Sequence, residues 1–339
     1  MSEASTSERP VLSPWLQGQL TTLLARRGHA WLLQGPSGLG QYTLGLELAR
    51  AWLCEHPTPH GACYQCRSCH AIDVRTHADL CTLMPETLAL ELNWPLDEKT
   101  QKDLDDKKRK PSKEIRVEAA RDMVSFSQQT RSGGSTKVVF VYPAERMNHV
   151  TANTILKTLE EPPGECRFVL ASEAAHLLLP TIRSRCQTHT MVWPSDTESM
   201  HWLQSQGVPA ADAATLLRAA GGRPEDALNL ATQGLKAAHW ASLPKAVLRG
   251  DVSAVADATP SQAIVMLQKL CHDLLAVRTG AQPRFFALED LPVAGTVASL
   301  TQWAKDLMES ARTSEHPYNA GLMFEALVAR AQTALRAKD

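Results

Sequence analysis

The chain has 339 residues, of which 44% are apolar and 21% charged, a composition typical of a globular protein with two or three domains. Its formal charge of -1 excludes a strong overall attraction to nucleic acid but leaves room for a local basic face. The N-terminus lacks a signal-peptide pattern, and no apolar run approaches the roughly 20 residues that span a bilayer. We therefore expect a cytoplasmic protein without membrane contact, whose eight cysteines are thiols or metal ligands.

Short apolar runs in the first half of the chain predict a parallel β-sheet. Ala30–Gln34, Lys137–Tyr142 and Arg167–Ala171 are continuously apolar, as expected of strands that are buried on both faces. Helical spacing is expected from about residue 43 to 53 and again over 150–161, where a proline pair ends the pattern. Strands that alternate with helices predict a doubly wound α/β domain.

A glycine-rich stretch, GPSGLGQYT, follows the first of these strands. A phosphate-binding P-loop has the pattern G-x-x-x-x-G-K-[ST], in which the lysine and the hydroxyl contact phosphates and magnesium. Gly35, Gly38 and Gly40 keep the glycine pattern, but Gln41 and Tyr42 replace the lysine and the hydroxyl residue. The glycines still serve the turn and the packing of strand against helix. The loop is therefore interpreted as a scaffold and not as an ATP site.

Four cysteines follow the expected helix with the spacing C-x8-C-x2-C-x2-C: Cys54, Cys63, Cys66 and Cys69. This arrangement is typical of structural zinc, which leaves no open coordination position for catalysis. An iron–sulfur cluster also uses four thiolates, but ferredoxin-type runs have a different spacing. A histidine could replace one cysteine, the candidates being His56, His60 and His70. Cys81, Cys166 and Cys271 have no partner at ligand spacing and are expected in the core.

Composition divides the chain into three expected domains. Residues 1–193 are expected to form the α/β domain, interrupted by the cysteine module at 54–70 and by an insertion at about 86–114. Residues 194–235 are expected to form a small helical lid. Residues 236–339 show apolar faces at helical spacing and are expected to form a helical bundle.

A charged run lies inside the insertion. Residues 97–113 hold five acidic and seven basic side chains, with Leu104 as the only large apolar one. Such a run buries too little apolar surface to order itself, so we expect a mobile insertion. A contact of Lys107–Lys110 with nucleic acid is the less favoured alternative.

Several stretches occur in an order that resembles one protein family. They are the glycine loop, the four-cysteine insertion, VFVYPAERMNHVTANTILKTLEEPP, and RFVLAS followed by LLPTIRSRCQTH. Over roughly residues 10–235 the chain resembles the bacterial DNA polymerase III clamp-loader ATPases of the AAA+ class. The resemblance implies an AAA+ P-loop-type parallel sheet domain with a zinc-binding insertion, a helical lid domain and a C-terminal helical collar domain for oligomerisation.

The positions that handle ATP in active members of this family are altered. Gln41 and Tyr42 stand at the lysine and hydroxyl positions, and Tyr142 and Pro143 stand where active members carry an Asp-Glu pair after a strand. At the sensor-2 position of GGRPEDAL, where active members carry an arginine, the chain has Glu225, whose carboxylate would repel phosphate. The resemblance therefore implies that this chain neither binds nor hydrolyses ATP.

Two nearby residues do not restore the pattern. Thr43 stands one residue after the hydroxyl position, although a slipped loop stays open as an alternative. Glu145 lies three positions late, beyond Pro143.

One functional motif of the family is intact at Ser184-Arg185-Cys186. The resemblance implies that Arg185 is presented at a subunit edge to ATP held by the neighbouring subunit. A guanidinium supplied in trans stabilises charge on the transferring phosphoryl group and accelerates other NTPases by roughly 10³–10⁵. Arg183 is the flanking candidate for this role, and pairing of Arg185 with a nearby acid is the structural alternative. Cys186 is expected to pack in the core.

The resemblance further implies a stator-like subunit of a heteropentamer with a delta subunit and three ATP-binding gamma/tau subunits. This assembly loads the beta sliding clamp onto primed DNA, as an accessory complex of a DNA-directed DNA polymerase. Two alternatives stay open: an active gamma/tau-like ATPase, and a zinc-bearing adaptor that binds DNA through residues 97–113.

Overall fold

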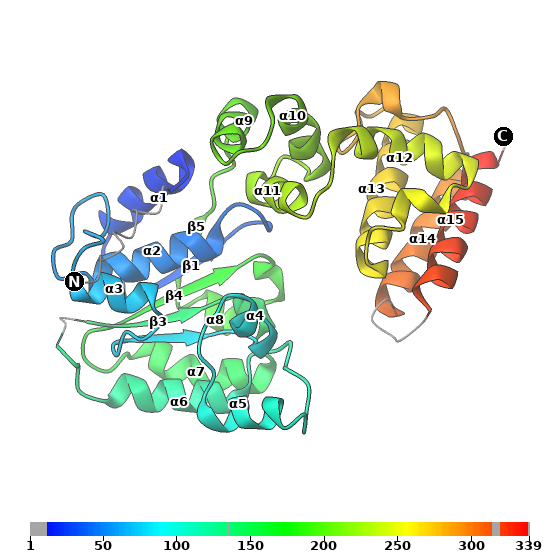
Figure 1. Cartoon of the computed structure of the whole chain (residues 1–339). Coiled ribbons are helices and arrows are strands. Elements are labelled where there is room, and N and C mark those ends of the chain that lie inside the picture. Colours follow the sequence, from blue (N-terminus) through cyan, green and yellow to red (C-terminus); the bar gives the residue numbers. More distant parts are fainter. Residues whose placement is uncertain (1–11, 134–135, 314–318, 338–339) are drawn as a thin grey trace, which may run out of the picture. The chain divides into compact units, whose positions relative to one another are not determined.

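The computed structural model describes residues 12–133, 136–313 and 319–337. Residues 1–11, on which the expectation of no signal peptide rests, lie outside the described part. The chain divides into two compact units, Met1–Pro194 and Ser195–Asp339 (Figure 1). A division of the second unit into lid and collar stays a prediction. None of the described helices is long and apolar enough to cross a membrane.

The first unit is built on a five-stranded parallel sheet with the order β2-β3-β4-β1-β5. Its strands are β1 (Ala30–Gln34), β2 (Leu80–Leu83), β3 (Lys137–Val141), β4 (Cys166–Ser172) and β5 (Gln187–Thr190). The three strands expected from sequence are confirmed to within one residue at each end. The two edge strands escaped notice because each is only four residues long, and β5 (QTHT) is polar.

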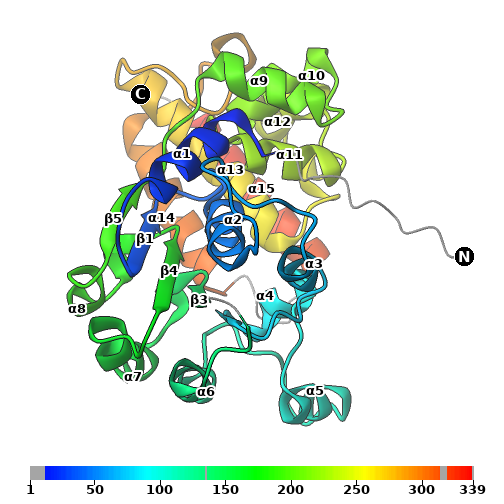
Figure 2. The same ribbon diagram turned by 90° about the vertical axis from the view of Figure 1, so that its left-hand side faces the viewer.

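Helices cover both faces of this sheet, as Figures 1 and 2 show. The helices of the first unit are α1 (Pro14–Leu24), α2 (Gln41–Leu53), α3 (Arg67–Asp73), α4 (Glu86–Glu91), α5 (Glu98–Asp105), α6 (Val117–Gln128), α7 (His149–Glu160) and α8 (Pro180–Arg183), with short 3-10 turns at Ala144–Arg146 and Ala175–Leu177.

Alternation along β3 explains why the two faces take different helices. Phe140 faces α2, where it lies so close to Gly45 that an added Cβ would come within 2.4 Å of its ring. Val139 and Val141 point to the opposite face and pack in one core with Ile155 of α7 and residues of α6. Successive side chains of a strand point to opposite faces, so both faces of β3 are buried. The expected α/β fold with an AAA+ P-loop-type sheet is confirmed.

The charged run contains more structure than its composition suggests. Helix α5 begins at an Asp97 N-cap that accepts a hydrogen bond from the Thr100 amide. Arg109 donates through both terminal nitrogens to the buried Glu86 carboxylate, at 2.9 Å for Nη2–Oε1. The Arg116 guanidinium lies 3.0 Å from the same carboxylate. Sequence analysis missed this helix and the ion pairs to Glu86, because a capping residue and an ion pair between distant residues leave no apolar pattern in the sequence. Mobility of the insertion stays a prediction.

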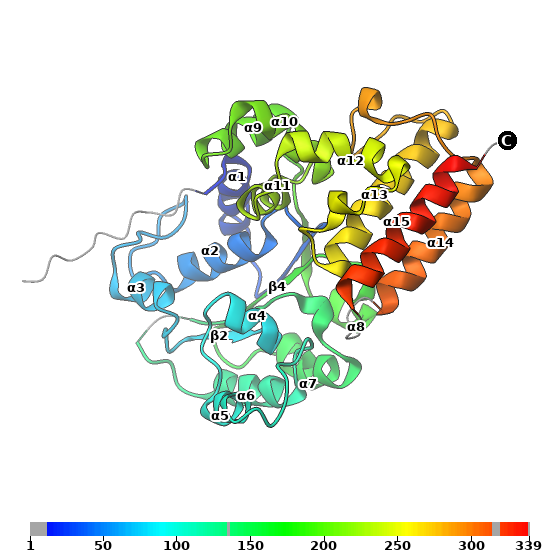
Figure 3. The same cartoon turned by 45° about the vertical axis from the view of Figure 1, so that its right-hand side comes forward.

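The second unit is helical throughout its described residues. Its helices are α9 (Asp196–Ser205), α10 (Ala210–Ala219), α11 (Pro224–Thr232), α12 (Ala237–Arg249), α13 (Pro260–Arg278), α14 (Val297–Thr313) and α15 (Ala320–Arg336), with 3-10 turns at Val252–Val255 and Leu288–Asp290. Figure 3 shows α13, α14 and α15 side by side. The two apolar helical faces expected from sequence lie in their common core, together with Cys271. Cys166 is buried in the first unit and Cys81 packs against the same core, which confirms the expectation for all three cysteines.

Candidate functional site

The glycine loop joins the carboxyl end of β1 to the first turn of α2. Gly38 and Gly40 have φ values of 76° and 90°, a left-handed conformation that glycine adopts without strain. At Gly35 an added Cβ would come within 2.9 Å of Met191 Cβ. The glycines are therefore required by the turn and its packing, which supports the interpretation of the loop as scaffold.

Gln41 is turned into the loop. Its side chain is buried, and its Nε2 donates to the carbonyl oxygens of Gly35 at 2.8 Å and Pro36 at 2.6 Å. A lysine at this position would extend an ammonium group toward bound phosphates. Here the amide instead satisfies two carbonyl groups of the loop, so the side chain at the lysine position serves the loop's own structure.

Tyr42 lies in an aromatic cluster beside the loop. Its ring centroid is 5.7 Å from that of Phe140 and 5.3 Å from that of Tyr142. Its hydroxyl accepts a 2.8 Å hydrogen bond from Trp94 Nε1, and Tyr142 donates at 2.7 Å to the Glu173 carboxylate. Tyr42, at the hydroxyl position of an active P-loop, therefore packs against Tyr142, which stands at an acidic position of an active site. Sequence reasoning missed Trp94, which lies 52 residues further along the chain and in no motif.

Three other residues were considered from sequence as parts of an ATP site: Glu145, Thr43 and Glu225. The Glu145 carboxylate accepts the Glu173 amide at 3.1 and 3.3 Å, so it serves as a loop cap. Thr43 lies within the first turn of α2. Glu225 belongs to the first turn of α11 in the second unit.

Arg185 lies just after α8 and just before β5. Its Nε and Nη2 donate to Glu160 Oε2 at 3.1 and 2.9 Å, and its Nη1 donates to the Thr181 carbonyl at 2.9 Å. The side chains of Arg185 and Glu160 are 29% and 56% exposed. An ion pair this accessible contributes about 0–1 kcal/mol to stability. The alternative in which Arg185 pairs with a nearby acid is therefore present in the structure. The pair is weak enough for Arg185 to leave Glu160 for another anionic partner.

The neighbours of Arg185 differ from it. Cys186 packs against the core of the first unit, and burial raises the pKa of its thiol to about 12. Ser184 is exposed and its hydroxyl donates to the Thr181 carbonyl at 3.2 Å. Arg183 is exposed on α8. Cys186 thus anchors the segment in the core, while Arg185 stays at the surface.

The register of the sheet separates Arg185 from the glycine loop of the same chain. β5 runs parallel to β1, with Gln187 opposite Trp31 and Thr190 opposite Gln34. Arg185 precedes the start of β5, whereas Gly35 follows the end of β1. The four strand residues between these levels span about 13 Å at 3.3 Å per residue. The two candidate elements therefore lie at opposite edges of the sheet, the glycine loop at the edge formed by the carboxyl ends of the strands and Arg185 at the edge formed by their amino ends.

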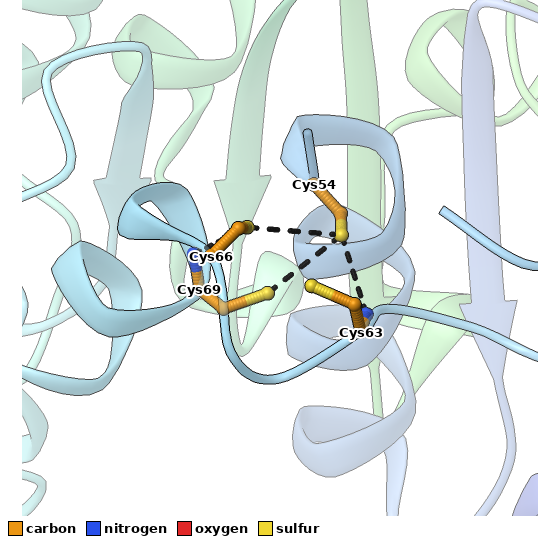
Figure 4. A group of neighbouring side chains, drawn as sticks. All are labelled: Cys54, Cys63, Cys66 and Cys69. Carbon is orange, nitrogen blue, oxygen red and sulfur yellow. Dashed lines mark hydrogen bonds between the residues drawn. The ribbon is translucent and has the colours of Figure 1, made fainter. Parts of the chain in front are cut away.

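The four cysteines converge although they come from the end of α2, the following loop and the start of α3 (Figure 4). Their sulfur atoms all lie within 4.8 Å of one another, with Cys54 Sγ at 3.9 Å from Cys66 Sγ and 3.8 Å from Cys69 Sγ. A tetrahedron with metal–sulfur bonds of about 2.3 Å has edges of about 3.8 Å. The thiols therefore fit a tetrahedral metal ion. In the described part of the chain, none of the three candidate histidines joins this group.

Backbone amides donate hydrogen bonds to two of these sulfurs. The Cys63 amide donates to Cys54 Sγ at 3.2 Å and the Cys69 amide to Cys66 Sγ at 3.4 Å. Burial opposes ionisation of Cys63, but the amides of Gln65 and Cys66 outweigh it and lower the pKa of the Cys63 thiol to about 6. Metals bind the thiolate form, so the loop favours the ligating state at Cys63, whereas burial raises the pKa of the Cys54 and Cys69 thiols.

A buried ion-pair network fixes the cysteine module to α2. Arg50 lies 3.0 Å from Glu47 and 2.7 Å from Asp73 of α3, and it donates to the Cys69 carbonyl at 3.0 Å. Tyr64 donates to Glu47 at 2.6 Å. Because α2 begins at the glycine loop and ends at Cys54, the loop and the module share one rigid helix.

Together, the parallel sheet, the glycine loop at its carboxyl edge and the helical second unit define an AAA+ type protein with an altered nucleotide loop. Residues 16–193, more than half of the chain, match the protein family described as DNA polymerase III, delta subunit. The chain belongs to this clamp-loader family, and several relatives that it resembles carry the name DNA polymerase III subunit delta'.

Two of these relatives show the degree of similarity. Subunit delta' of Pseudomonas aeruginosa is 36% identical over 227 residues, which cover 66% of this chain and 62% of that protein. Subunit delta' of Escherichia coli is 34% identical over 224 residues, which cover 64% and 60%. The match thus spans less than two thirds of either relative. The DNA polymerase III subunit tau/gamma of Haemophilus influenzae is more distant, with 28% identity over 216 residues, 62% of this chain and 28% of that protein.

Proposed function

We propose that the chain acts as the non-hydrolysing, stator-like delta' subunit of the DNA polymerase III clamp loader in the cytoplasm. In this role it has no ATPase activity of its own and binds no ATP. It assembles with delta and gamma/tau subunits, with residues 194–235 as lid and 236–339 as collar, and helps to load the beta sliding clamp onto primer–template DNA.

The observation that carries this proposal is the contrast between the two edges of the sheet. At the carboxyl edge, Gln41 is bonded to the loop carbonyls and Tyr42 to Trp94, so the chain's own side chains occupy the positions that would handle phosphate. At the other edge, Arg185 keeps a partly exposed guanidinium. It lies too far from its own loop to act there, which supports action on a nucleotide held by the neighbouring subunit.

For the cysteine cluster, we propose a structural zinc ion held by Cys54, Cys63, Cys66 and Cys69, one per chain. Sulfur spacing and the absence of an open position among four protein ligands support zinc in a structural role. When bound, the ion would cross-link α2 to α3, and its binding energy would add to folding energy.

The arginine assignment is tested in the reconstituted pentamer by single-turnover ATP hydrolysis, with Arg185→Ala compared with Arg183→Ala. We expect Arg185→Ala to remove the fast hydrolysis of one ATP per complex, because one neighbouring site loses its trans guanidinium and slows by roughly 10³-fold or more. Arg183→Ala, which changes an exposed arginine two residues away, should keep every fast turnover. Equal behaviour of the two variants removes the assignment.

The absence of nucleotide binding is tested on the isolated chain by titration with a fluorescent ATP analogue and magnesium. No saturable binding is expected. Binding with hydrolysis would identify a gamma/tau-like ATPase instead. Tight DNA binding by the isolated chain with a steep salt dependence, lost when residues 97–113 are deleted, would identify a DNA-binding adaptor.

A further inference from the structure

Glu160 is a residue to which neither the family pattern nor the proposed function gives a role. It ends α7, and its carboxylate takes two of the hydrogen bonds that Arg185 donates. Both use the same oxygen, Oε2, at 3.1 Å from Nε and 2.9 Å from Nη2. The Thr181 carbonyl takes a third bond, from Nη1.

These three bonds leave a defined part of the guanidinium available. An arginine has five N–H donors, one on Nε and two on each terminal nitrogen. The bonds to Glu160 and Thr181 use one donor on each of the three nitrogens. Among the described residues, one donor remains without a partner on Nη1 and one on Nη2. Two donors on the terminal nitrogens can bind a phosphate group bidentately.

The backbone that carries Glu160 and Arg185 is anchored in the core, while their side chains reach the surface. α7 packs against the sheet through Ile155 and Leu159, and Cys186 packs in the same core next to Arg185. The carboxylate and the guanidinium nevertheless stay partly exposed, so their attraction is screened by solvent and contributes little to folding. The contact is better suited to orienting a side chain than to stabilising the fold.

We propose that Glu160 is a positioning residue, which with the Thr181 carbonyl aims the two remaining donors of Arg185 outward at a phosphate of the nucleotide in the neighbouring subunit. This inference rests on the proposed function. Glu160 does not touch ATP, so its removal should disorder the guanidinium without changing what binds ATP. A misplacement of about 1 Å at a reacting centre costs roughly 100-fold in rate.

The test measures single-turnover ATP hydrolysis in the reconstituted pentamer with Glu160→Ala, Arg185→Ala and the double variant. Glu160→Ala should slow the one turnover that depends on Arg185 by about 10- to 100-fold, with the KM for ATP unchanged. The double variant should be no slower than Arg185→Ala alone, because a positioning residue has nothing to act on without the arginine.

Two further variants separate positioning from a general effect. Glu160→Gln should retain most of the rate, because one amide oxygen has lone pairs for both donors. Glu161→Ala, at the exposed neighbouring position, should behave as wild type. Thermal melting of the free chain should be the same for all of these variants within the small contribution of an exposed ion pair.

Several results would overturn the proposal. They are a wild-type rate for Glu160→Ala, a faster rate, which would make Glu160 a restraint on the arginine, or a double variant whose loss equals the product of the single losses. If Arg185→Ala itself leaves every turnover intact, it is the proposed trans role of the arginine that fails.

Discussion

The glycine loop and the segment around Arg185 lie at opposite edges of one sheet and treat their polar side chains in opposite ways. Gln41 is buried, and its amide is used up by two carbonyls of its own loop. Arg185 is partly exposed and keeps two of its five donors. A side chain that donates its hydrogen bonds to the nearby backbone supports the fold, whereas one that keeps donors at the surface can bind a partner. Under the proposed function, the domain has closed its own ATP site and kept an arginine available for the site of a neighbouring subunit.

The largest expected effect is loss of the proposed zinc ion, whose ligand Cys54 directly follows α2, the helix that begins at the glycine loop. Cys69→Ser should release the zinc and destabilise the first unit by about 4–5 kcal/mol or more, since loss of a structural metal is among the most damaging changes. Zinc content by atomic emission and urea unfolding would measure both effects. Cys81→Ala, outside the cluster, should keep one zinc per chain. Protein purified without chelator that contains no zinc would contradict the site.

A second test asks whether Gln41 is structural. Gln41→Ala should destabilise the chain by about 1–3 kcal/mol, because the Gly35 and Pro36 carbonyls lose a buried donor. Arg185→Ala should change stability by only about 0–1 kcal/mol, as expected of an exposed pair. Urea unfolding of the two variants side by side measures the difference. Equal losses would remove the contrast between the two edges.

A third test concerns the hydrogen bond between the insertion and the loop. Trp94→Phe keeps an aromatic ring at this position but deletes the donor to the Tyr42 hydroxyl, and should cost about 1 kcal/mol. In a Tyr42→Phe background the same change should cost much less, because the partner is already gone. Additive losses in this double-mutant cycle would show that the two side chains do not interact.

The smallest expected effect is a pH dependence in β5, the strand that starts just after Arg185 and pairs with β1. Burial, with a smaller contribution from Arg26, lowers the pKa of His189, whose Nε2 lies 2.9 Å from Gln19 Oε1. The unfolded chain therefore binds a proton more readily than the folded one. The contribution of neutral His189 to the free energy of unfolding is fully present above the unfolded pKa of about 6.5. It is lost as the pH falls below that value.

The measurement compares wild type with His189→Gln in urea at pH 8 and pH 5.5. The difference in stability between the two proteins should shrink or reverse toward the lower pH, by at most about 1.4 kcal/mol per pH unit. A difference that is constant across this range would show that His189 titrates alike in both states.

Sequence reasoning was most successful where a feature depends on neighbours along the chain. The glycines, the cysteine spacing and the three central strands were recognised because a turn, a ligand set and a buried strand each leave a local pattern. The edge strands β2 and β5 were missed because each is only four residues long and β5 is also polar. The helix α5 was missed because a capped, charged helix has almost no apolar pattern. Trp94 and Glu160 were missed as partners because each meets its partner only across the fold.

The sequence by itself determined the family, the class of fold and the loss of the side chains that handle ATP, since all of these are written as residue types at fixed spacing. Only the tertiary structure decided which groups the side chains around these positions contact. It placed the Gln41 amide on the loop carbonyls, Trp94 on Tyr42 and Glu160 on Arg185. The reason is physical: a hydrogen bond depends on where two groups lie in space, and for partners 25 or 52 residues apart that position is set by the packing of the whole domain.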